Sequence, residues 1–291
     1  MNKIVLMSGA QYFGDDDAIN VFMDASVPVD VHQAIAEHNL IQETLVEAGI
    51  EVRRTEVPKN CQDGVYTANW ALVKNGKALM ARLPNTRQPE EAYALKAMRD
   101  QGIEPVILPP EVARFSGQGD ALPCGDVVFT QSPYRTVKEA HPHLKSFGFK
   151  EVIALETLPA YDENGQPLIN EITGLPDSPT YDIDLAIAIL KMPVDGNKGL
   201  IAWCPDVFKD ESRERMESYR GVDKIAVSKE EALEAFALNL LSTGETVIMN
   251  SGAPKFKADL EAHGLEVKTL DLPELRKGGG SIRCSTLTLD N

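Results

Sequence analysis

The sequence predicts an α/β protein built as one closed, pseudosymmetric domain. Its 291 residues are enough for one large domain or two small ones. One pattern recurs along the chain: an amphipathic helix, a glycine that ends it, and a short strand rich in β-branched residues. No Ser/Pro-rich linker divides the chain, so we expect residues 1–291 to form a single domain. A Rossmann sheet fits less well, because no GxGxxG follows the first strand.

The predicted helices and strands follow this pattern in order. Glycine is the expected residue at the end of each helix, where the backbone becomes left-handed. The five predicted helix–strand units are 31–48 with 49–52, 90–101 with 102–108, 142–147 with 148–155, 229–243 with 244–249, and 255–263 with 264–270. Further strands are expected at 65–74, 77–83, 126–130 and 200–203. Residues 158–180 are turn-rich and long enough to predict a functional loop.

Composition narrows the classes of partner and compartment. With 29 Lys+Arg against 44 Asp+Glu the net charge is -15, and no basic tract is present, which argues against nucleic acid and membrane surfaces. A cationic substrate would suit this charge, although it is also an ordinary solubility charge. The four cysteines form no CxxC pair, and the N-terminus lacks the apolar run of a signal peptide, so we expect free thiols and a cytoplasmic location. No motif for a metal or an organic cofactor is present.

Three short segments carry groups suited to chemistry. Residues 278–284 (GGGSIRC) do not match a phosphate loop, because Ser285–Leu289 is predicted to be a strand with the cysteine at its start. The glycines let the backbone turn sharply or pass close to a ligand. Residues 115–120 (FSGQGD) form a glycine-rich turn ending in a carboxylate. Asp182 and Asp184 would lie on one face of a strand if that segment is extended.

Taken together and in order, these segments resemble those of the guanidino-group-modifying superfamily. The matching segments are AINVFMD (18–24), DGVYTANWALV (63–73), GQGDAL (117–122), YRT (134–136), YDIDLA (181–186) and GGGSIRCSTLTL (278–289). The superfamily contains arginine deiminases, dimethylarginine dimethylaminohydrolases and amidinotransferases. The chain is most similar to its bacterial dimethylarginine- and citrulline-hydrolase-like branch. The resemblance covers nearly the whole chain and implies the five-bladed α/β-propeller (pentein) fold.

The resemblance also implies a covalent mechanism on a guanidino or ureido amino acid. Cys284 matches the family nucleophile, whereas Cys61, Cys124 and Cys204 are typical of buried, inert cysteines. The guanidinium is held by acceptors at positions that match Asn69 and Asp184, assisted by Asp63 and by Asp120 of the GD turn. The substrate carboxylate is bound by arginines, which match Arg87 and Arg135. Without the resemblance, surface salt bridges would be the expectation for these two arginines. A bound cation would also lower the pKa of the Cys284 thiol.

The sequence departs from the family pattern at one functional pair. Asp182 stands where the family has its general acid/base histidine, and Ser116 stands where the carboxylate that orients this histidine is found. None of the five histidines is an evident replacement, and we expect all of them to face solvent or cap helices.

Two functions remain open. The first is an active hydrolase in which Asp182 takes over acid/base work, with a raised pKa caused by Asp184 and by burial. The second is a degenerate protein that binds a guanidino compound without turnover. Retention of Cys284, Asp184, Arg87 and Arg135 favours the first, which we prefer; loss of the histidine and its partner favours the second. A non-enzymatic, ribosome-binding role is disfavoured by the charge. The family is often dimeric, so a homodimer is left open.

Overall fold

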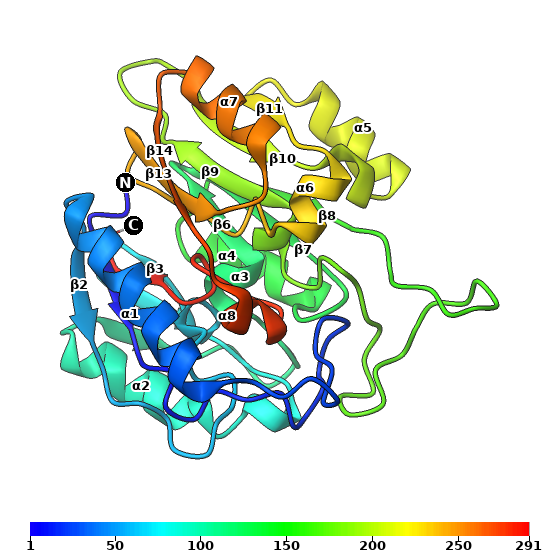
Figure 1. Cartoon of the computed structure of the whole chain (residues 1–291). Helices are drawn as coiled ribbons and strands as arrows, with labels where there is room; N and C mark the ends of the chain where they lie inside the picture. Colours follow the sequence, from blue (N-terminus) through cyan, green and yellow to red (C-terminus); the bar gives the residue numbers. More distant parts are fainter. Residues whose placement is uncertain (291) are drawn as a thin grey trace.

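The computed structural model describes residues 1–290, which form five small sheets with helices between them (Figure 1). Each sheet has three strands: the middle strand is antiparallel to one neighbour and parallel to the other. The sheets are β15 (Leu287–Thr288), β1 (Ile4–Met7), β2 (Glu51–Arg54); β3 (Ala71–Lys74), β4 (Lys77–Met80), β5 (Glu104–Val106); β6 (Ala121–Cys124), β7 (Val127–Gln131), β8 (Glu151–Leu155); β9 (Ile187–Lys191), β10 (Gly199–Trp203), β11 (Val222–Ala226); and β12 (Leu241–Ser242), β13 (Thr246–Asn250), β14 (Glu266–Leu270).

A helix makes the crossover between the two parallel strands of every sheet, as a parallel connection requires. These helices are α1 (Val31–Glu47), α2 (Glu90–Asp100), α4 (His141–Ser146), α5 (Asp210–Ser218) and α7 (Pro254–Ala262). Three short helices, α3 (Gly117–Asp120), α6 (Lys229–Glu234) and α8 (Pro273–Lys277), lie in the connections. In α1 the Asp30 side chain caps the first turn by accepting from Gln33 N at 3.1 Å, and Ala34, Ile41 and Leu45 are fully buried.

The first sheet is completed by the two ends of the described chain. Strand β15 pairs with β1, with Val5 opposite Thr288 and Leu6 opposite Leu287. The Asp290 carboxylate accepts from the backbone N–H groups of Lys3 and Ile4 at 2.9 and 3.0 Å. The last strand of the repeat therefore belongs to the same sheet as the first.

The structure corrects several predicted elements. Residues 67–70 form a 3-10 turn (η1) before β3, not the start of a strand. The helix expected at 229–243 ends at Glu234, and the fourth crossover is instead α5 with β11. Helix α5 was not predicted because only Ser212 and Met216 of its nine residues are buried, so its sequence has no periodic apolar face. Strand β15 covers only Leu287–Thr288, so Cys284 lies in the preceding turn and not at the start of a strand.

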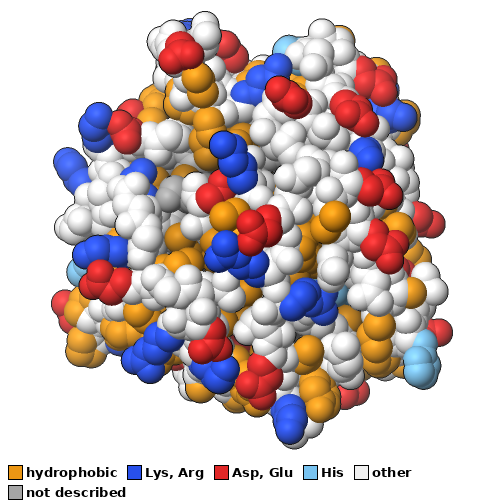
Figure 2. All heavy atoms as spheres, turned by 90° about the vertical axis from the view of Figure 1, so that its left-hand side faces the viewer, with side chains coloured by type: hydrophobic (Ala, Val, Ile, Leu, Met, Phe, Trp, Pro, Cys, Tyr) orange, Lys and Arg blue, Asp and Glu red, His pale blue; other side chains and the backbone are white. Residues whose placement is uncertain are grey.

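Two features of the exterior bear on function. Segment 158–180 extends away from the sheets at the right of Figure 1 and exposes Tyr161, Ile169 and Ile172. On the face drawn in Figure 2, acidic and basic side chains are interspersed, so the charge of -15 is not gathered into one patch there. No helix within residues 1–290 is both long and apolar enough to cross a bilayer.

Candidate active site

Four of the predicted site residues come from equivalent places in the five sheets. They lie in the segments that precede the outer antiparallel strand of a sheet: Asn69 before β3, Asp120 before β6, Asp184 before β9 and Cys284 before β15. The fifth such segment, before β12, carries Asn239. All five side chains are buried. Hydrogen bonds join neighbouring turns, such as Ala68 N to Cys284 O at 3.0 Å and Ile183 N to Asp120 Oδ1 at 2.9 Å. One structural position, repeated five times, therefore supplies five side chains of the site.

The Cys284 sulfur lies between a donor and an acceptor. Asn239 Nδ2 donates to Sγ at 3.1 Å, and Sγ donates to Asp184 Oδ2 at 3.4 Å. The turn itself is fixed by Asn239 Oδ1, which accepts from the backbone N–H groups of Ser281 and Cys284 at 3.0 and 3.2 Å. A Cβ on Gly280 would lie 2.9 Å from Cys284 Cβ, so this glycine gives the cysteine its space.

Asp182 and Asp184 diverge instead of sharing the face of a strand. Residues 183–185 form a 3-10 turn (η4), which corrects the extended conformation considered above. Asp182 Oδ2 accepts from Asn69 Nδ2 at 2.7 Å, and the same amide nitrogen lies 2.9 Å from Ser116 Oγ. The positions that match the family's histidine and its orienting carboxylate are therefore adjacent in space, bridged by Asn69.

Two carboxylate oxygens beside the cysteine are left without a donor. Asp182 Oδ1 and Asp184 Oδ1 are buried and have no hydrogen-bond partner within residues 1–290, and Asp120 Oδ2 is in the same situation. Buried carboxylate oxygens normally accept hydrogen bonds, because leaving them without partners costs free energy. This part of the site is thus suited to a ligand that brings N–H donors and positive charge.

Burial dominates the electrostatics of the site. It raises the pKa values of Asp120 and Asp184 well above the usual range, with the charge of Asp182 adding to both, and it raises the pKa of Asp182 itself. The pKa of Asp63 is raised to about 6 by burial, against the opposing charge of Arg87. Burial and then the charges of Asp184 and Asp182 raise the pKa of the Cys284 thiol well above its ordinary value. In the absence of a cation, the thiol form of Cys284 is therefore favoured.

Arg87 is held by protein groups at the edge of the site. Its guanidinium forms a bidentate ion pair with Glu90, with both N–O distances at 2.8 Å, and this pair is buried. A third nitrogen, Nη1, donates to Asn69 Oδ1 at 2.8 Å, and Nη2 reaches the carbonyl of Asp63 at 3.1 Å. In this structure Arg87 orients Asn69, whereas the sequence assigned it to the substrate carboxylate.

Arg135 connects the site to the N-terminal loop that contains residues 18–19. Its Nη2 donates to Ile19 O at 2.7 Å, and its guanidinium lies over the Tyr181 ring at 4.8 Å. Segment 158–180 reaches the same region, because Asn170 Nδ2 donates to Ala18 O at 2.9 Å. Residues 18–19, from the predicted AINVFMD segment, are thus held from two directions.

The other cysteines and the histidines lie outside the cluster. Cys61, Cys124 and Cys204 are buried free thiols, and burial raises the pKa of Cys124 to about 12 and that of Cys204 to about 11. His38 does not face solvent as predicted: it is buried against Arg54, and burial lowers its pKa to about 3. Across the described part of the chain, no group of three or more His, Cys, Asp and Glu side chains is arranged to hold a metal ion.

Sequence reasoning missed Asn239 and Glu90. Glu90 was counted only as the start of a helix, since nothing in the sequence shows that it lies beside Arg87. Asn239 was placed inside the helix expected at 229–243. The signal that could have found it is the repeat itself, because Asn239 and Asn69 each stand two residues before the first strand of their sheets.

Comparison with known proteins places this geometry in a family. No protein-family model matches the chain. It is 32% identical over 289 residues to N(G),N(G)-dimethylarginine dimethylaminohydrolase of Mycobacterium tuberculosis, covering 97% of this chain and 84% of the relative. It is 25% identical to the bifunctional arginine dihydrolase/ornithine cyclodeaminase ArgZ of Synechocystis sp., of which it spans 37%.

Solved structures agree at the level of the fold. The N-terminal domain of ArgZ, solved as a cysteine-to-serine mutant bound to substrate, has a TM-score of 0.84 at 23% identity and covers 99% of this chain and 98% of that one. A dimethylarginine dimethylaminohydrolase adduct with S-methyl-L-thiocitrulline has a TM-score of 0.70 at 18% identity and covers 99% of both chains. Within the guanidino-group-modifying superfamily predicted from the motifs, this chain therefore belongs to the dimethylarginine dimethylaminohydrolase family.

Proposed function

We propose that the protein is a cysteine-dependent hydrolase of a guanidino or ureido amino acid of the arginine, methylated arginine or citrulline type. The names of its relatives support this substrate class. The observation that carries the proposal is the arrangement at Cys284: a thiol bonded to Asp184, with the unpartnered oxygens Asp184 Oδ1 and Asp182 Oδ1 buried in the same cluster. A planar guanidinium supplies both the N–H donors and the positive charge that this cluster lacks.

The reaction begins with substrate binding. A guanidinium beside Asp184 offsets the carboxylate charges that raise the pKa of the Cys284 thiol, so the substrate helps to form its own nucleophile. The thiol proton passes to Asp184, and the sulfur attacks the central guanidino carbon. The C–N bond then breaks, and the amine leaves with a proton from Asp182. The product of this half-reaction is a thiouronium-type intermediate on Cys284.

Water completes the turnover. Asp182 accepts a proton from the attacking water, the new C–O bond forms, and the C–S bond breaks with return of a proton to sulfur. With arginine as substrate the products are citrulline and ammonia. The raised pKa of Asp182 suits this double role, because a general acid must hold its proton near neutral pH. Asn69 and Ser116 orient this carboxylate, in place of the family's orienting carboxylate.

The remaining substrate contacts follow from the same arrangement. Arg135 binds the substrate carboxylate, Asp63 faces the substrate from the η1 side, and Asp120 supports the η4 turn through Ile183 N. Arg87 acts on the substrate through Asn69 and contributes its charge to the carboxylate end.

The proposal extends to the whole chain. Residues 1–291 form one domain, and the five sheets are arranged about a pseudo-fivefold axis as a propeller with the five turns around that axis. The four free cysteines support a cytoplasmic location.

The experiment that tests the function is a substrate panel with matched cysteine variants. Arginine, asymmetric dimethylarginine and citrulline are incubated with the parent, with Cys284→Ser and with Cys204→Ser, and released ammonia, amine and ureido product are measured. We expect turnover by the parent and by Cys204→Ser, none by Cys284→Ser, and a covalent adduct on Cys284 in the intact mass. If a compound of the panel raises the thermal stability of the protein but yields neither product nor adduct, the hydrolase proposal is wrong, and a protein that binds a guanidino compound without turnover is supported.

A double variant tests the role of Asp182. Asp182→His with Ser116→Glu restores the residue types that the family has at these two positions. If Asp182 is the working acid, the double variant loses parent activity toward the preferred substrate. Activity that appears only in the double variant would instead support the degenerate alternative.

A further inference from the structure

Arg283 is a buried cation with no carboxylate in contact. Its side chain is 8% exposed, and its three hydrogen bonds go to neutral acceptors: Thr286 O at 3.2 Å, Thr288 Oγ1 at 3.3 Å and Gln118 Oε1 at 2.9 Å. Within residues 1–290 it forms no ion pair at 4.0 Å or less, in contrast to the buried Arg87, which has Glu90 at 2.8 Å. A buried charge held only by neutral acceptors is costly unless an anion lies near enough to offset it.

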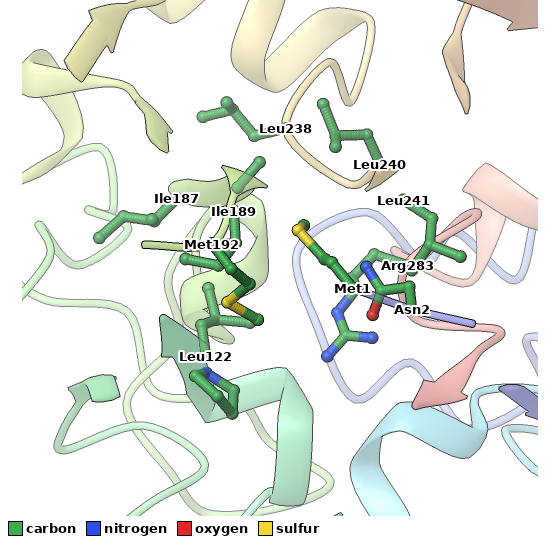
Figure 3. A pocket seen from close by; sticks show the side chains of 12 residues that line it. Met1, Asn2, Leu122, Ile187, Ile189, Met192, Leu238, Leu240, Leu241 and Arg283 are labelled. Atoms are coloured by element: carbon green, nitrogen blue, oxygen red, sulfur yellow. The ribbon is translucent and has the colours of Figure 1, made fainter. Parts of the chain in front are cut away.

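The surroundings of Arg283 are largely apolar, which strengthens the electrostatic effect of its charge. It lines a small cavity of about 30 Å³ whose other side chains are largely apolar, including Ile187, Met192 and Leu240 (Figure 3). Arg283 and Cys284 are consecutive in one turn, yet the cysteine bonds to Asp184 while the arginine borders this cavity. Apolar surroundings screen a charge weakly, so the positive charge of Arg283 acts on the groups in the neighbouring turns.

We infer that Arg283 is a positioning residue that stabilises negative charge on the Cys284–Asp184 pair. The inference rests on the proposed role of Cys284 as the nucleophile. The anions that act on Arg283 are Asp184 and Cys284, and the Arg283 charge in turn opposes the rise in the Asp184 pKa. Asp182, Tyr66 and Tyr181 also interact electrostatically with Cys284, and none of these three carries a positive charge.

Gln118 holds this charge in place. Its Oε1 accepts from both Arg283 Nη2 and Thr288 N at 2.9 Å, and its Nε2 donates to Thr288 O at 2.8 Å. Gln118 thus binds the β15 backbone as a neighbouring strand would, and it ties the Asp120 turn to the Cys284 turn. The amide is well suited to this position, because a carboxylate there would form an ion pair with Arg283 and cancel its effect on the thiol.

Alkylation of Cys284 tests the inference without requiring turnover. The rate of iodoacetamide modification is measured from pH 6 to 11 by peptide mass for the parent, Arg283→Lys and Arg283→Gln, after circular dichroism has shown that each is folded. Below the midpoint the rate follows the thiolate fraction, so Arg283→Gln should lower the Cys284 rate about tenfold at each pH, which corresponds to a midpoint about one pH unit higher. Arg283→Lys should stay close to the parent. Cys124 and Cys204 in the same samples serve as internal controls, and their profiles should not move.

A second variant keeps the test decisive if Arg283→Gln does not fold. Gln118→Glu leaves Arg283 in place and brings a carboxylate against it, so the Cys284 midpoint should again rise. An unchanged midpoint in folded Arg283→Gln, or in Gln118→Glu, overturns the inference. If the parent shows no turnover but the midpoints shift as expected, the proposed function fails and the role of Arg283 stands.

Discussion

At the scale of single residues, the site combines groups whose preferred protonation states conflict. Asp63, Asp120, Asp182 and Asp184 are buried carboxyl groups with raised pKa values, and the pKa of the Cys284 thiol is raised as well, whereas the attack that we propose requires the thiolate. Such a cluster lowers the stability of the ligand-free protein at neutral pH, because folding then requires the carboxyl groups to take up protons that the unfolded chain has released. A bound guanidinium relieves the same conflict, which links ligand binding to stability.

The effect of one such buried carboxyl group on the free energy of unfolding can be measured at Asp63. Its folded-state pKa of about 6 exceeds the ordinary value of 3.8, so its favourable contribution is complete below pH 3.8 and is lost as pH rises through 6. We expect Asp63→Asn to stabilise the ligand-free protein at pH 7.5 by about 3 kcal/mol relative to its effect at pH 3.5. Urea unfolding of both proteins at the two pH values checks this. Parallel pH dependences would contradict it.

His38 acts with the opposite sign. Burial lowers its pKa to about 3, so the folded state keeps it neutral while the unfolded chain binds a proton below about 6.5. Stability from this group is therefore present above pH 6.5 and is lost as pH falls toward 3. In His38→Gln we expect the stability difference from the parent to change by about 1.4 kcal/mol per pH unit between pH 5.5 and 4. A constant difference across that range would show that His38 is protonated in the fold.

At the scale of elements, the short turns decide the chemistry. Residues 115–120 were predicted as a glycine-rich turn ending in a carboxylate, whereas residues 117–120 form the four-residue helix α3, where the glycine pattern matters for a steric reason. A Cβ on Gly119 would lie 2.7 Å from Asp182 Oδ2 and still closer to Asn69 Nδ2. The backbone of α3 therefore approaches the Asn69–Asp182 pair as closely as only glycine permits.

Gly119→Ala tests the importance of this approach. The added methyl should push Asn69 and Asp182 apart, lowering kcat by about 100-fold and stability by about 1–3 kcal/mol. Gly14→Ala is the matched control, because its nearest neighbour would be Gln62 Cβ at 3.8 Å. Steady-state kinetics and thermal unfolding of both variants are the measurements. Equal kcat values for Gly119→Ala and the parent would show that the pair has no catalytic role.

The same scale shows where sequence reasoning succeeded and where it stopped. Helices α1, α2 and α7 were predicted closely because each has an apolar face and ends at a glycine. The turns η1 and η4 were assigned to strands or left undecided, since their residues have strand composition while tertiary contacts hold them in 3-10 turns. The hydrogen bond between Asn69 and Asp182 joins turns that are far apart in the chain, so no local sequence pattern could predict it.

At the scale of the whole molecule, each of the five repeats has a short segment of the candidate site directly before the outer antiparallel strand of its sheet. Motifs far apart in the chain therefore meet in one cluster, in which Asn69, Asp120, Asp184 and Cys284 lie together. Glu90, the partner of Arg87, and Asn239, the partner of Cys284, could be identified only from the structure. The net charge of -15 also takes on a clearer meaning. Most acidic side chains are at the surface, whereas Asp120, Asp182 and Asp184 are buried in the cluster that contains Cys284.

Removal of residues 287–291 tests the closure of the first sheet. Without β15, strand β1 loses its antiparallel neighbour, Gln118 loses Thr288, and Arg283 loses one acceptor. We expect the truncated chain to lose cooperative unfolding and near-ultraviolet circular dichroism, whereas Asp290→Ala should cost only about 1 kcal/mol. Urea titrations of the two variants provide the comparison. A truncated chain that unfolds with the parent m-value would contradict this account.

The pairing of β15 with β1 has a consequence for the order in which the protein is made. The ribosome releases β1 first, yet this strand waits for its neighbour until nearly all of the described chain has been synthesised. The Cys284 turn is synthesised just before β15, so Cys284, the nucleophile that we propose, is added only after the four other turns of the cluster. In the proposed mechanism, a nascent chain therefore has no nucleophile in this site until β1 can pair with β15.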